Sequence, residues 1–475
     1  MKNLTAPTAD QLAAWNKQAN VLRETILNTP NMEIPESAAV YYVSPDGDDA
    51  SGGKSPETAW KTIQKVNDAP LNEGDYVCFE RGGLWRGKFT AKPGVTYTAY
   101  GEGAKPRIYG SPFNGAKVGW EKVAENIWRC SEKFANDVGG ISFNEGEAYG
   151  LKILVNYADD GTMSEQVAQT VFEGYTSLDE ELEFWHDMGG PVASPEEPSY
   201  LYLYCSKGNP AEVYDDIEFF IRGNIISAKS GVTIDNLCIK YGGSHGIGAG
   251  TVTSLTVTNC EVGEIGGAIQ FVRNGKITRF GNGVEIYGGC ENYLIDHCYV
   301  YQCYDAGVTH QYSSGGTNDI IEKNVTYRSN LIEDCIYNIE YFLGKPDSSD
   351  TTRYMENILM TDNILLRAGY GWGAQRPDKT PDAHIKSWDH MNTLKGDFII
   401  ENNLMMYSNH MMLHLGVYDE KDLPIVRNNT FVQTMGGQFG RCAKVPTSML
   451  MYTHEIANLP AFASNDFYVT PDKPE

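Results

Sequence analysis

Short segments in which apolar and polar residues alternate recur through the second half of the chain. Seven eight-residue segments align, and their third and eighth positions are almost always apolar. Such alternation is typical of β-strands that bury one face. The segments are VTIDNLCI from Val232, LTVTNCEV from Leu255, YLIDHCYV from Tyr293, VTYRSNLI from Val325, ILMTDNIL from Ile358, FIIENNLM from Phe398 and PIVRNNTF from Pro424. Their starts lie 23, 38, 32, 33, 40 and 26 residues apart, so the shortest spacing approaches one bare coil and the longer ones need inserted loops.

The sixth position of these segments changes from small apolar residues to asparagine along the chain. It holds Leu237, Cys260, Cys298, Asn330, Asn363, Asn403 and Asn429. An amide both donates and accepts hydrogen bonds, so equivalent asparagines on successive coils can stack into a ladder. A leucine-rich repeat is excluded because no LxxLxL pattern recurs, and a propeller needs longer, more regular blades. The pattern predicts an all-β fold, a parallel β-helix in which each coil buries its inward side chains on its neighbours.

The rest of the chain divides by pattern. Residues 8–28 carry Leu12, Trp15, Ala19, Leu22 and Ile26 at helical spacing, and Thr8 with Gln11 fits a capping box. We expect an N-terminal helical segment (1–38) packed over the end of a larger core, the start of the β-helix (39–115), a β-rich insertion (116–215), the main β-helix with a groove (216–440) and a C-terminal tail (441–475).

Charge and composition narrow the partners. Sixty-two acidic residues against 38 basic ones give a net charge of −24, which disfavours nucleic acid and polyanionic glycans. No apolar run is long enough to span a membrane, and the first residues lack a signal-peptide core. The ten cysteines have irregular spacing, which favours reduced, buried thiols. We therefore expect a cytoplasmic protein that needs no cofactor or metal, and a homo-oligomer is compatible with the sequence.

Three features together resemble a known superfamily. They are the opening YYVSPDGDDASGGKSPETAWKTI, the segment GDYVCFERGGLWRG and the asparagine-bearing coils. They look like the pectin-lyase-like proteins, which are right-handed parallel β-helices and include many carbohydrate-active enzymes. The resemblance covers about residues 40–440. It implies the fold and a carbohydrate substrate, and it does not select a reaction, because no single family's motif set is matched.

A second strand follows each repeated segment and predicts a row of outward side chains. Aligning these strands on their apolar positions turns Ile247, Val284, Val308, Ile339 and Leu413 inward. The next residues, Gly248, Glu285, Thr309, Glu340 and His414, then point outward on neighbouring coils about 4.8 Å apart. Asp305 lies in the turn that borders the same face, where it serves chemistry or caps its own backbone.

Two or three carboxylates on one groove are what glycoside hydrolysis requires. We predict Asp305, Glu285 and Glu340 as catalytic, with a preference for Asp305 as base or nucleophile and a glutamate as acid. The predicted substrate-binding residues are His310, Gln311, His245, Trp372, Gln375, Arg376, His414 and Tyr341. His310 points inward by parity, which favours a core role, and the coil between Glu340 and His414 is expected to present GYGWGAQR, with Trp372 and Gln375 facing the groove. The polar stretch 370–391, which also holds Trp388 and Asp389, is expected to close one end of the groove.

These residues predict a glycoside hydrolase that acts, in an exo manner, on neutral or weakly charged oligosaccharides. One alternative is a polysaccharide lyase or epimerase acting on uronic-acid glycans, which needs a basic residue that the groove strands are expected to lack. A further alternative is a non-catalytic carbohydrate-binding β-helix.

Overall fold

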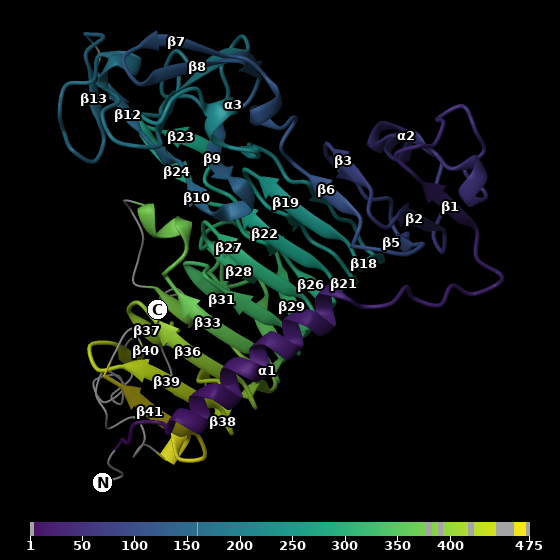
Figure 1. Cartoon of the computed structure of the whole chain (residues 1–475). Helices are drawn as coiled ribbons and strands as arrows, with labels where there is room; N and C mark the ends of the chain where they lie inside the picture. The colour runs from purple at the N-terminus through teal and green to yellow at the C-terminus, as the bar shows by residue number, and fades with distance from the viewer. Residues whose placement is uncertain are drawn as a thin grey trace.

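A computed structural model describes residues 4–158, 160–376, 382–387, 393–416, 422–442 and 460–471. The predicted all-β architecture is confirmed: the chain is a parallel β-helix with three long sheets running along the solenoid (Figure 1). The first sheet contains β1 (Val40–Val43), β2 (Tyr76–Glu80), β5 (Thr96–Tyr100), β18 (Val232–Asp235), β21 (Leu255–Thr258), β26 (Cys290–Asp296), β29 (Ile320–Arg328), β32 (Arg353–Thr361), β35 (Phe398–Glu401) and β38 (Ile425–Arg427).

The other two sheets complete each coil. The second sheet contains β3 (Leu84–Arg86), β6 (Arg107–Tyr109), β9 (Val138–Phe143), β10 (Ala148–Tyr149), β16 (Ile217–Ile221), β19 (Cys238–Gly242), β22 (Glu261–Ile265), β27 (Tyr299–Cys303), β30 (Leu331–Glu333), β33 (Ile364–Ala368), β36 (Leu404–Ser408), β39 (Thr430–Thr434) and β41 (Asp466–Thr470). The third, which we call the groove sheet, contains β4 (Phe89–Thr90), β17 (Ile226–Ser227), β20 (Ile247–Ala249), β25 (Val284–Tyr287), β28 (Ala306–Tyr312), β31 (Tyr337–Leu343), β34 (Ala383–Lys386), β37 (Met411–Leu415) and β40 (Gln438–Cys442).

Each repeated segment turns a corner between the first and second sheets. Its fifth residue adopts a positive φ between 50° and 58° in every coil from Val232 onward. Those residues are mostly Asn, Asp, Ser or His, types that enter the left-handed region more readily than bulky or β-branched residues do. The corner residues are Asn236, Asn259, His297, Ser329, Asp362, Asn402 and Asn428.

The sixth residue of each segment then points into the solenoid, and the predicted asparagine ladder forms. Asn330 Nδ2 donates to Asn363 Oδ1 at 2.9 Å, and the same contact recurs from Asn363 to Asn403 and from Asn403 to Asn429 at 2.9 Å. The ladder continues one rung further than expected, because Asn429 donates to Asn465 at 2.9 Å. These amides are buried, so their mutual bonds satisfy groups that water cannot reach.

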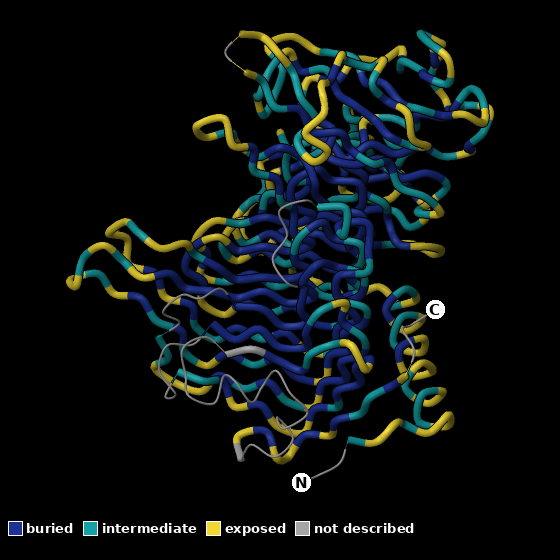
Figure 2. Tube along the Cα trace, turned by 90° about the vertical axis from the view of Figure 1, so that its left-hand side faces the viewer, coloured by how far each residue is buried: buried dark blue, intermediate teal, exposed yellow. Residues whose placement is uncertain are grey.

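The interior is a continuous stack of aliphatic and aromatic side chains. All five residues predicted to face inward from the groove sheet are fully buried in this core. Figure 2 shows the buried stretches lying one above another along the solenoid, with exposed residues gathered in the loops. The nine cysteines whose side chains are described are free and buried, as expected.

The N-terminal helix α1 (Ala9–Leu27) covers a side of the solenoid instead of an end, so the expected position is wrong. Thr8 and Gln11 form the predicted capping box. Ala19 and Ile26 are buried against the second sheet, whose outward positions there are apolar (Figure 1). Leu331, Ile364, Leu366, Leu404, Met406 and Val432 supply that apolar strip. The apolar stripe of an amphipathic helix is fully buried when it lies along an apolar strip of similar length on a sheet.

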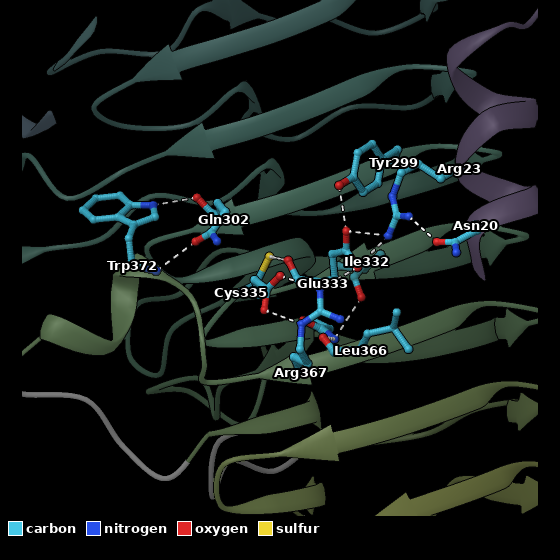
Figure 3. A network of polar contacts seen from close by, with 12 residues as sticks. Asn20, Arg23, Tyr299, Gln302, Ile332, Glu333, Cys335, Leu366, Arg367 and Trp372 are labelled. Carbon is cyan, nitrogen blue, oxygen red and sulfur yellow. Dashed lines mark hydrogen bonds and ion pairs between the residues drawn. The ribbon is translucent and has the colours of Figure 1, made fainter. Parts of the chain in front are cut away.

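An ion network fixes the helix on that sheet (Figure 3). Arg23 places Nη2 2.9 Å from Glu333 Oε1, and Tyr299 donates its hydroxyl to the same oxygen at 2.7 Å. Arg367 approaches the other oxygen of Glu333 at 2.8 Å and also Asp334 at 2.7 Å. In the part of the chain that the structure describes, no helix is long and apolar enough to cross a membrane.

Residues between β6 and β16 contribute a mainly antiparallel sheet of β7 (Trp120–Ala124), β8 (Ile127–Phe134), β15 (Ser199–Tyr204), β14 (Glu183–His186) and β11 (Leu151–Lys152), in which only the pairing of β11 with β14 is parallel. Figure 1 shows this sheet at the top of the view, above β9 and β10. The smaller elements are α2 (Ile63–Asp68), α3 (Pro210–Val213), the hairpin of β12 (Val155–Tyr157) with β13 (Met163–Glu165) and the hairpin of β23 (Ile269–Arg273) with β24 (Lys276–Arg279).

Replacing a central rung of the ladder should destabilise the fold. In Asn363→Ala, the Asn330 amide donors and the Tyr327 carbonyl lose their partner. We expect the free energy of unfolding to fall by roughly 3 kcal/mol, since a buried unsatisfied polar group costs about 1–3 kcal/mol. Urea unfolding measures this change, with Asn16→Ala on the exposed helix surface as control, expected within about 0.5 kcal/mol of the parent. Equal effects of the two substitutions would contradict the ladder's role.

A carboxyl group inside the solenoid should make stability fall with rising pH. Glu322 is fully buried, neither of its oxygens has a hydrogen-bond partner among the described residues, and burial raises its pKa well above the usual value. The folded state therefore holds the proton more tightly than the unfolded state, and stability declines as pH rises above the ordinary glutamate range. Between pH 5 and pH 8, wild type should lose more unfolding free energy in urea titrations than Glu322→Gln does. Parallel pH profiles of the two proteins would rule this out.

Candidate functional site

The groove sheet places the predicted acids in one outward row. Glu285 pairs in register with Thr309, Thr309 with Glu340, Glu340 with Lys386, and Lys386 with His414. The register predicted for Glu285, Thr309 and Glu340 is therefore confirmed. The two glutamates stand two strands apart, about 9.6 Å between Cα atoms.

Side chains that surround Glu285 stabilise its ionised form. Asn282 Nδ2 donates to Glu285 Oε2, and His245 Nδ1 lies 2.9 Å from the same oxygen. Burial raises the pKa of Glu285, but His245, Asn282 and Gln311 together outweigh burial, and the pKa lies below the ordinary value. The His245 ring is itself held by stacking on Phe280, with 5.5 Å between ring centroids.

Glu340 has the opposite environment. Burial, with the nearby negative charge of Asp305, raises its pKa to about 7, although the ammonium group of Lys386 opposes the shift. Lys386 donates to Glu340 Oε1. At neutral pH a substantial fraction of Glu340 is protonated, whereas Glu285 is ionised.

Lys386 lies on a strand of the groove sheet, so the expectation that the groove strands lack a basic residue is wrong. The strand between β31 and β37 is β34, with the sequence AHIK, and not the expected GYGWGAQR stretch. Its last residue, Lys386, is buried, which lowers the pKa of its ammonium group, and it lies 3.9 Å from the Tyr337 ring centroid. Arg376 places Nη1 2.8 Å from Asp305 Oδ1.

These side chains surround a cavity of about 380 Å³. The hairpin of β23 and β24 and the segment after it supply one wall, and Arg376 belongs to another insertion that precedes β34. Both insertions therefore border the groove sheet. The lining residues are Lys276, Phe280, Glu285, Tyr287, Asp305, Gln311, Tyr337, Glu340, Phe342, Arg376 and Lys386.

Several predicted binding residues lie away from this cavity. His310 and Tyr341 point into the solenoid, where His310 Nδ1 lies 2.7 Å from the Tyr327 hydroxyl and burial lowers the His310 pKa to about 3. The prediction of substrate contact is wrong for both, because strand alternation turns them to the face opposite Thr309 and Glu340.

The segment before β34 is held by two other predicted residues that do not line the cavity. Trp372 is buried, and its indole N–H donates to the Gln302 carbonyl at 2.7 Å (Figure 3). Gln375 Nε2 donates to the Gly150 carbonyl at 3.2 Å. Both therefore anchor the insertion that carries Arg376. Trp388 and Asp389 lie outside the described residues, and His414 lies in the outward row one strand beyond Lys386 without lining the cavity.

Sequence reasoning missed Lys386, Asn282, Lys276 and Phe280. The strand AHIK carried a signal for Lys386, since Ile385 aligns with the inward residue Ile339 and alternation then turns Lys386 outward. Asn282 sits two residues before β25 and was not distinguishable from an ordinary turn residue.

Comparisons with known proteins give a limited likeness. No family model matches the chain. A lacto-N-biosidase of Bifidobacterium longum subsp. longum is 33% identical over 132 residues, which are 25% of this chain and 8% of that protein. The chain thus spans only a small part of the curated relative it matches.

Among solved structures, XylC in complex with xylose has a TM-score of 0.44 and 12% identity, over 85% of this chain and 69% of that one. A GH136 lacto-N-biosidase from Eubacterium ramulus has a TM-score of 0.42 and 13% identity, over 97% and 72%. A polygalacturonase from Erwinia carotovora has a TM-score of 0.33 and 10% identity, over 94% and 96%. The fold assignment rests on the sheet topology and not on these scores.

Removing the charge of Lys386 should raise the pKa of Glu340. In Lys386→Met, burial and Asp305 remain while the opposing ammonium is lost, so the carboxyl should titrate above its wild-type value of about 7. Carbon-13 NMR of the glutamate carboxyls, with the signal assigned by Glu340→Gln, measures the midpoint. Lys276→Met, at an exposed position of the same cavity, should leave it nearly unchanged. A midpoint that falls in Lys386→Met would contradict this electrostatic coupling.

Proposed function

We propose that the protein is a glycoside hydrolase acting on neutral or weakly charged oligosaccharides. The observation that carries the proposal is a pair of buried carboxyls in one cavity whose pKa values are driven in opposite directions. Such a pair provides a proton donor and an anion at the same pH, which glycosidic cleavage requires.

In this mechanism Glu340 is the general acid. It gives its proton to the glycosidic oxygen as the bond to the anomeric carbon breaks, and the leaving alcohol departs neutral. Glu285, held ionised by its donors, takes a proton from the water that attacks the anomeric carbon. The separation of two strands leaves room for that water and favours inversion of configuration, for which carboxyls lie about 6.5–9.5 Å apart.

Asp305 takes a different role from the one first preferred for it. Its carboxylate is paired with Arg376 and raises the pKa of Glu340 through its charge. It therefore keeps the acid protonated and fixes Arg376 on the cavity wall, while the transferred protons pass through the two glutamates.

The lining of the cavity favours sugars. Tyr287, Phe280 and Phe342 offer rings on which the apolar faces of sugars stack. The curated relative is named a lacto-N-biosidase, so lacto-N-bioside substrates are the first to test. The insertions at both sides of the groove sheet favour exo action on short chains.

Leaving-group dependence separates the two glutamates. Glu340→Gln should lose about 10²–10⁴-fold in kcat on an unactivated oligosaccharide and far less on a nitrophenyl glycoside, whose leaving group needs no proton. Glu285→Gln should lose activity on both substrates. Steady-state kinetics measures the contrast, with Glu356→Gln on β32 as a control outside the cavity. Equal losses by Glu340→Gln on both substrates would remove it as the acid.

The pH dependence tests Asp305. Activity should fall as pH rises through the Glu340 pKa of about 7, because the acid loses its proton. Asp305→Asn removes the negative charge that raises the pKa of Glu340. The fall in activity should therefore begin at lower pH, with a moderate loss in kcat. A loss of 10³-fold or more without movement of the pH profile would instead assign Asp305 as base or nucleophile.

The buried Lys386 favours a second candidate, β-elimination on a uronic-acid glycan. Its lowered pKa suits a base that removes the proton next to the uronate carboxyl, and Arg376 and Lys276 lie in the same cavity. A lyase would convert polyuronides to unsaturated uronates, whose ultraviolet absorbance measures the reaction. Appearance of this absorbance with wild type and its loss in Lys386→Met would select the lyase. Cleavage of oligosaccharides without that absorbance selects the hydrolase.

A further inference from the structure

A serine, a histidine and an aspartate lie in contact at the junction between the antiparallel sheet and the solenoid. Ser199 Oγ at the start of β15 lies 2.9 Å from His186 Nε2 at the end of β14. On the other side of the ring, His186 Nδ1 lies 3.6 Å from Asp137 Oδ1, just before β9. A nucleophile, a base and an orienting carboxylate in this order are the parts of a hydrolytic triad, which is recognised by geometry and not by fold.

The aspartate of this cluster is rigid and ionised. Asp137 is fully buried, and the Ile269 N–H donates to its Oδ2 at 2.6 Å. Burial raises the pKa of Asp137, but Lys152 and then His186 outweigh it and hold the pKa below the ordinary value. Lys152 also donates to Oδ1 and to the Val138 carbonyl, so the carboxylate cannot rotate away from the histidine.

The histidine is fixed between the two. His186 is buried, and the edge of Phe134 packs against its ring with 5.8 Å between centroids. The Val138 N–H donates to Nδ1 at 3.4 Å, a long hydrogen bond that the tautomer needed for catalysis replaces with a bond from Nδ1–H to Asp137. For His186 to accept the serine proton on Nε2, its hydrogen must reside on Nδ1, and the ionised Asp137 favours that tautomer.

Ser199 is partly exposed and faces open space. Ser199 lines a cavity of about 490 Å³, separate from the groove, whose wall combines apolar and acidic side chains. Met188, Val192, Pro195 and Pro198 are apolar members, Asp187, Glu196 and Glu197 are acidic ones, and Lys133 is a basic one, so acidic side chains outnumber basic ones. A short uncharged acyl group suits such a wall, and an anionic substrate does not.

We propose that this cluster is a second active site, which hydrolyses short-chain acyl esters. Ser199 Oγ attacks the ester carbonyl while His186 Nε2 takes its proton, and His186 then gives that proton to the departing alcohol. Water attacks the resulting acyl-serine, its proton returns through His186 to Ser199, and the carboxylic acid is released. Asp137 is a positioning residue. None of the three residues lines the groove cavity, so this activity goes beyond the proposed glycosidase.

Two measurements on the full chain test the proposal. The first is hydrolysis of 4-nitrophenyl acetate by wild type, Ser199→Ala, His186→Gln and Asp137→Asn. Ser194→Ala is the matched control, since Ser194 lies in the same region and its hydroxyl donates to Asn136 at 3.0 Å. The second is labelling of wild type with a fluorophosphonate, followed by peptide mass spectrometry.

We expect Ser199→Ala and His186→Gln to lose at least tenfold in kcat and Ser194→Ala to match wild type. Asp137→Asn should lower kcat with KM unchanged. The label should appear on Ser199, and Glu340→Gln should retain ester hydrolysis, which separates this site from the groove. Ester hydrolysis by Ser199→Ala at the wild-type rate, or labelling that leaves Ser199 unmodified, would overturn the proposal. Should a variant fail to fold, the labelling of wild type decides alone.

Discussion

The interaction on which the rest of the structure depends is the hydrogen bond between one buried asparagine amide and the next along the solenoid. Each amide also bonds a backbone carbonyl of the preceding coil, as Asn363 does with Tyr327. A slip of one residue in any of these strands would leave the amides without hydrogen-bond partners in an interior that excludes water. The free-energy cost of those unsatisfied groups disfavours the shifted register. The ladder therefore fixes the register of the coils from Asn330 onward, which include those of Glu340 and Lys386, and register decides which of their side chains share the outward row.

The row in turn explains how charged groups come to be buried at the groove. Side chains on adjacent strands are close enough to touch, so Glu340 can pair with Lys386 one strand away. Glu285 lies beyond Thr309 and finds its partners on the other side, in Asn282 and His245. The two glutamate carboxyls thus have different pKa values because the neighbouring side chains differ. The coils repeat along the solenoid axis, but the chemical properties of the groove change from one coil to the next.

The repeat made most of the fold predictable, since inward residues such as Val308 and Ile339 follow from alternation alone. The same argument placed Glu285 and Glu340 correctly. It failed for the coil of Lys386, where a long insertion drew attention to GYGWGAQR and away from the short strand that follows. The surface on which α1 packs could not be predicted either. An amphipathic pattern shows that a helix packs on some apolar surface, but it does not identify that surface. Contacts that join distant segments, such as Ser199 with His186 and Asp137, follow from tertiary packing that no local pattern encodes.

The corner between the first and second sheets has the same length in every coil that carries the repeat, with one left-handed residue and one inward residue. The two insertions that border the cavity fall elsewhere, before the groove-sheet strands β25 and β34. The chain can therefore grow or shorten beside the strip that bears the acids without changing these corners. Relatives built on this scaffold can exchange what surrounds the reacting groups while the coil geometry stays intact. Substrate range and stability are in that sense encoded in separate stretches of sequence, and each can drift with little effect on the other.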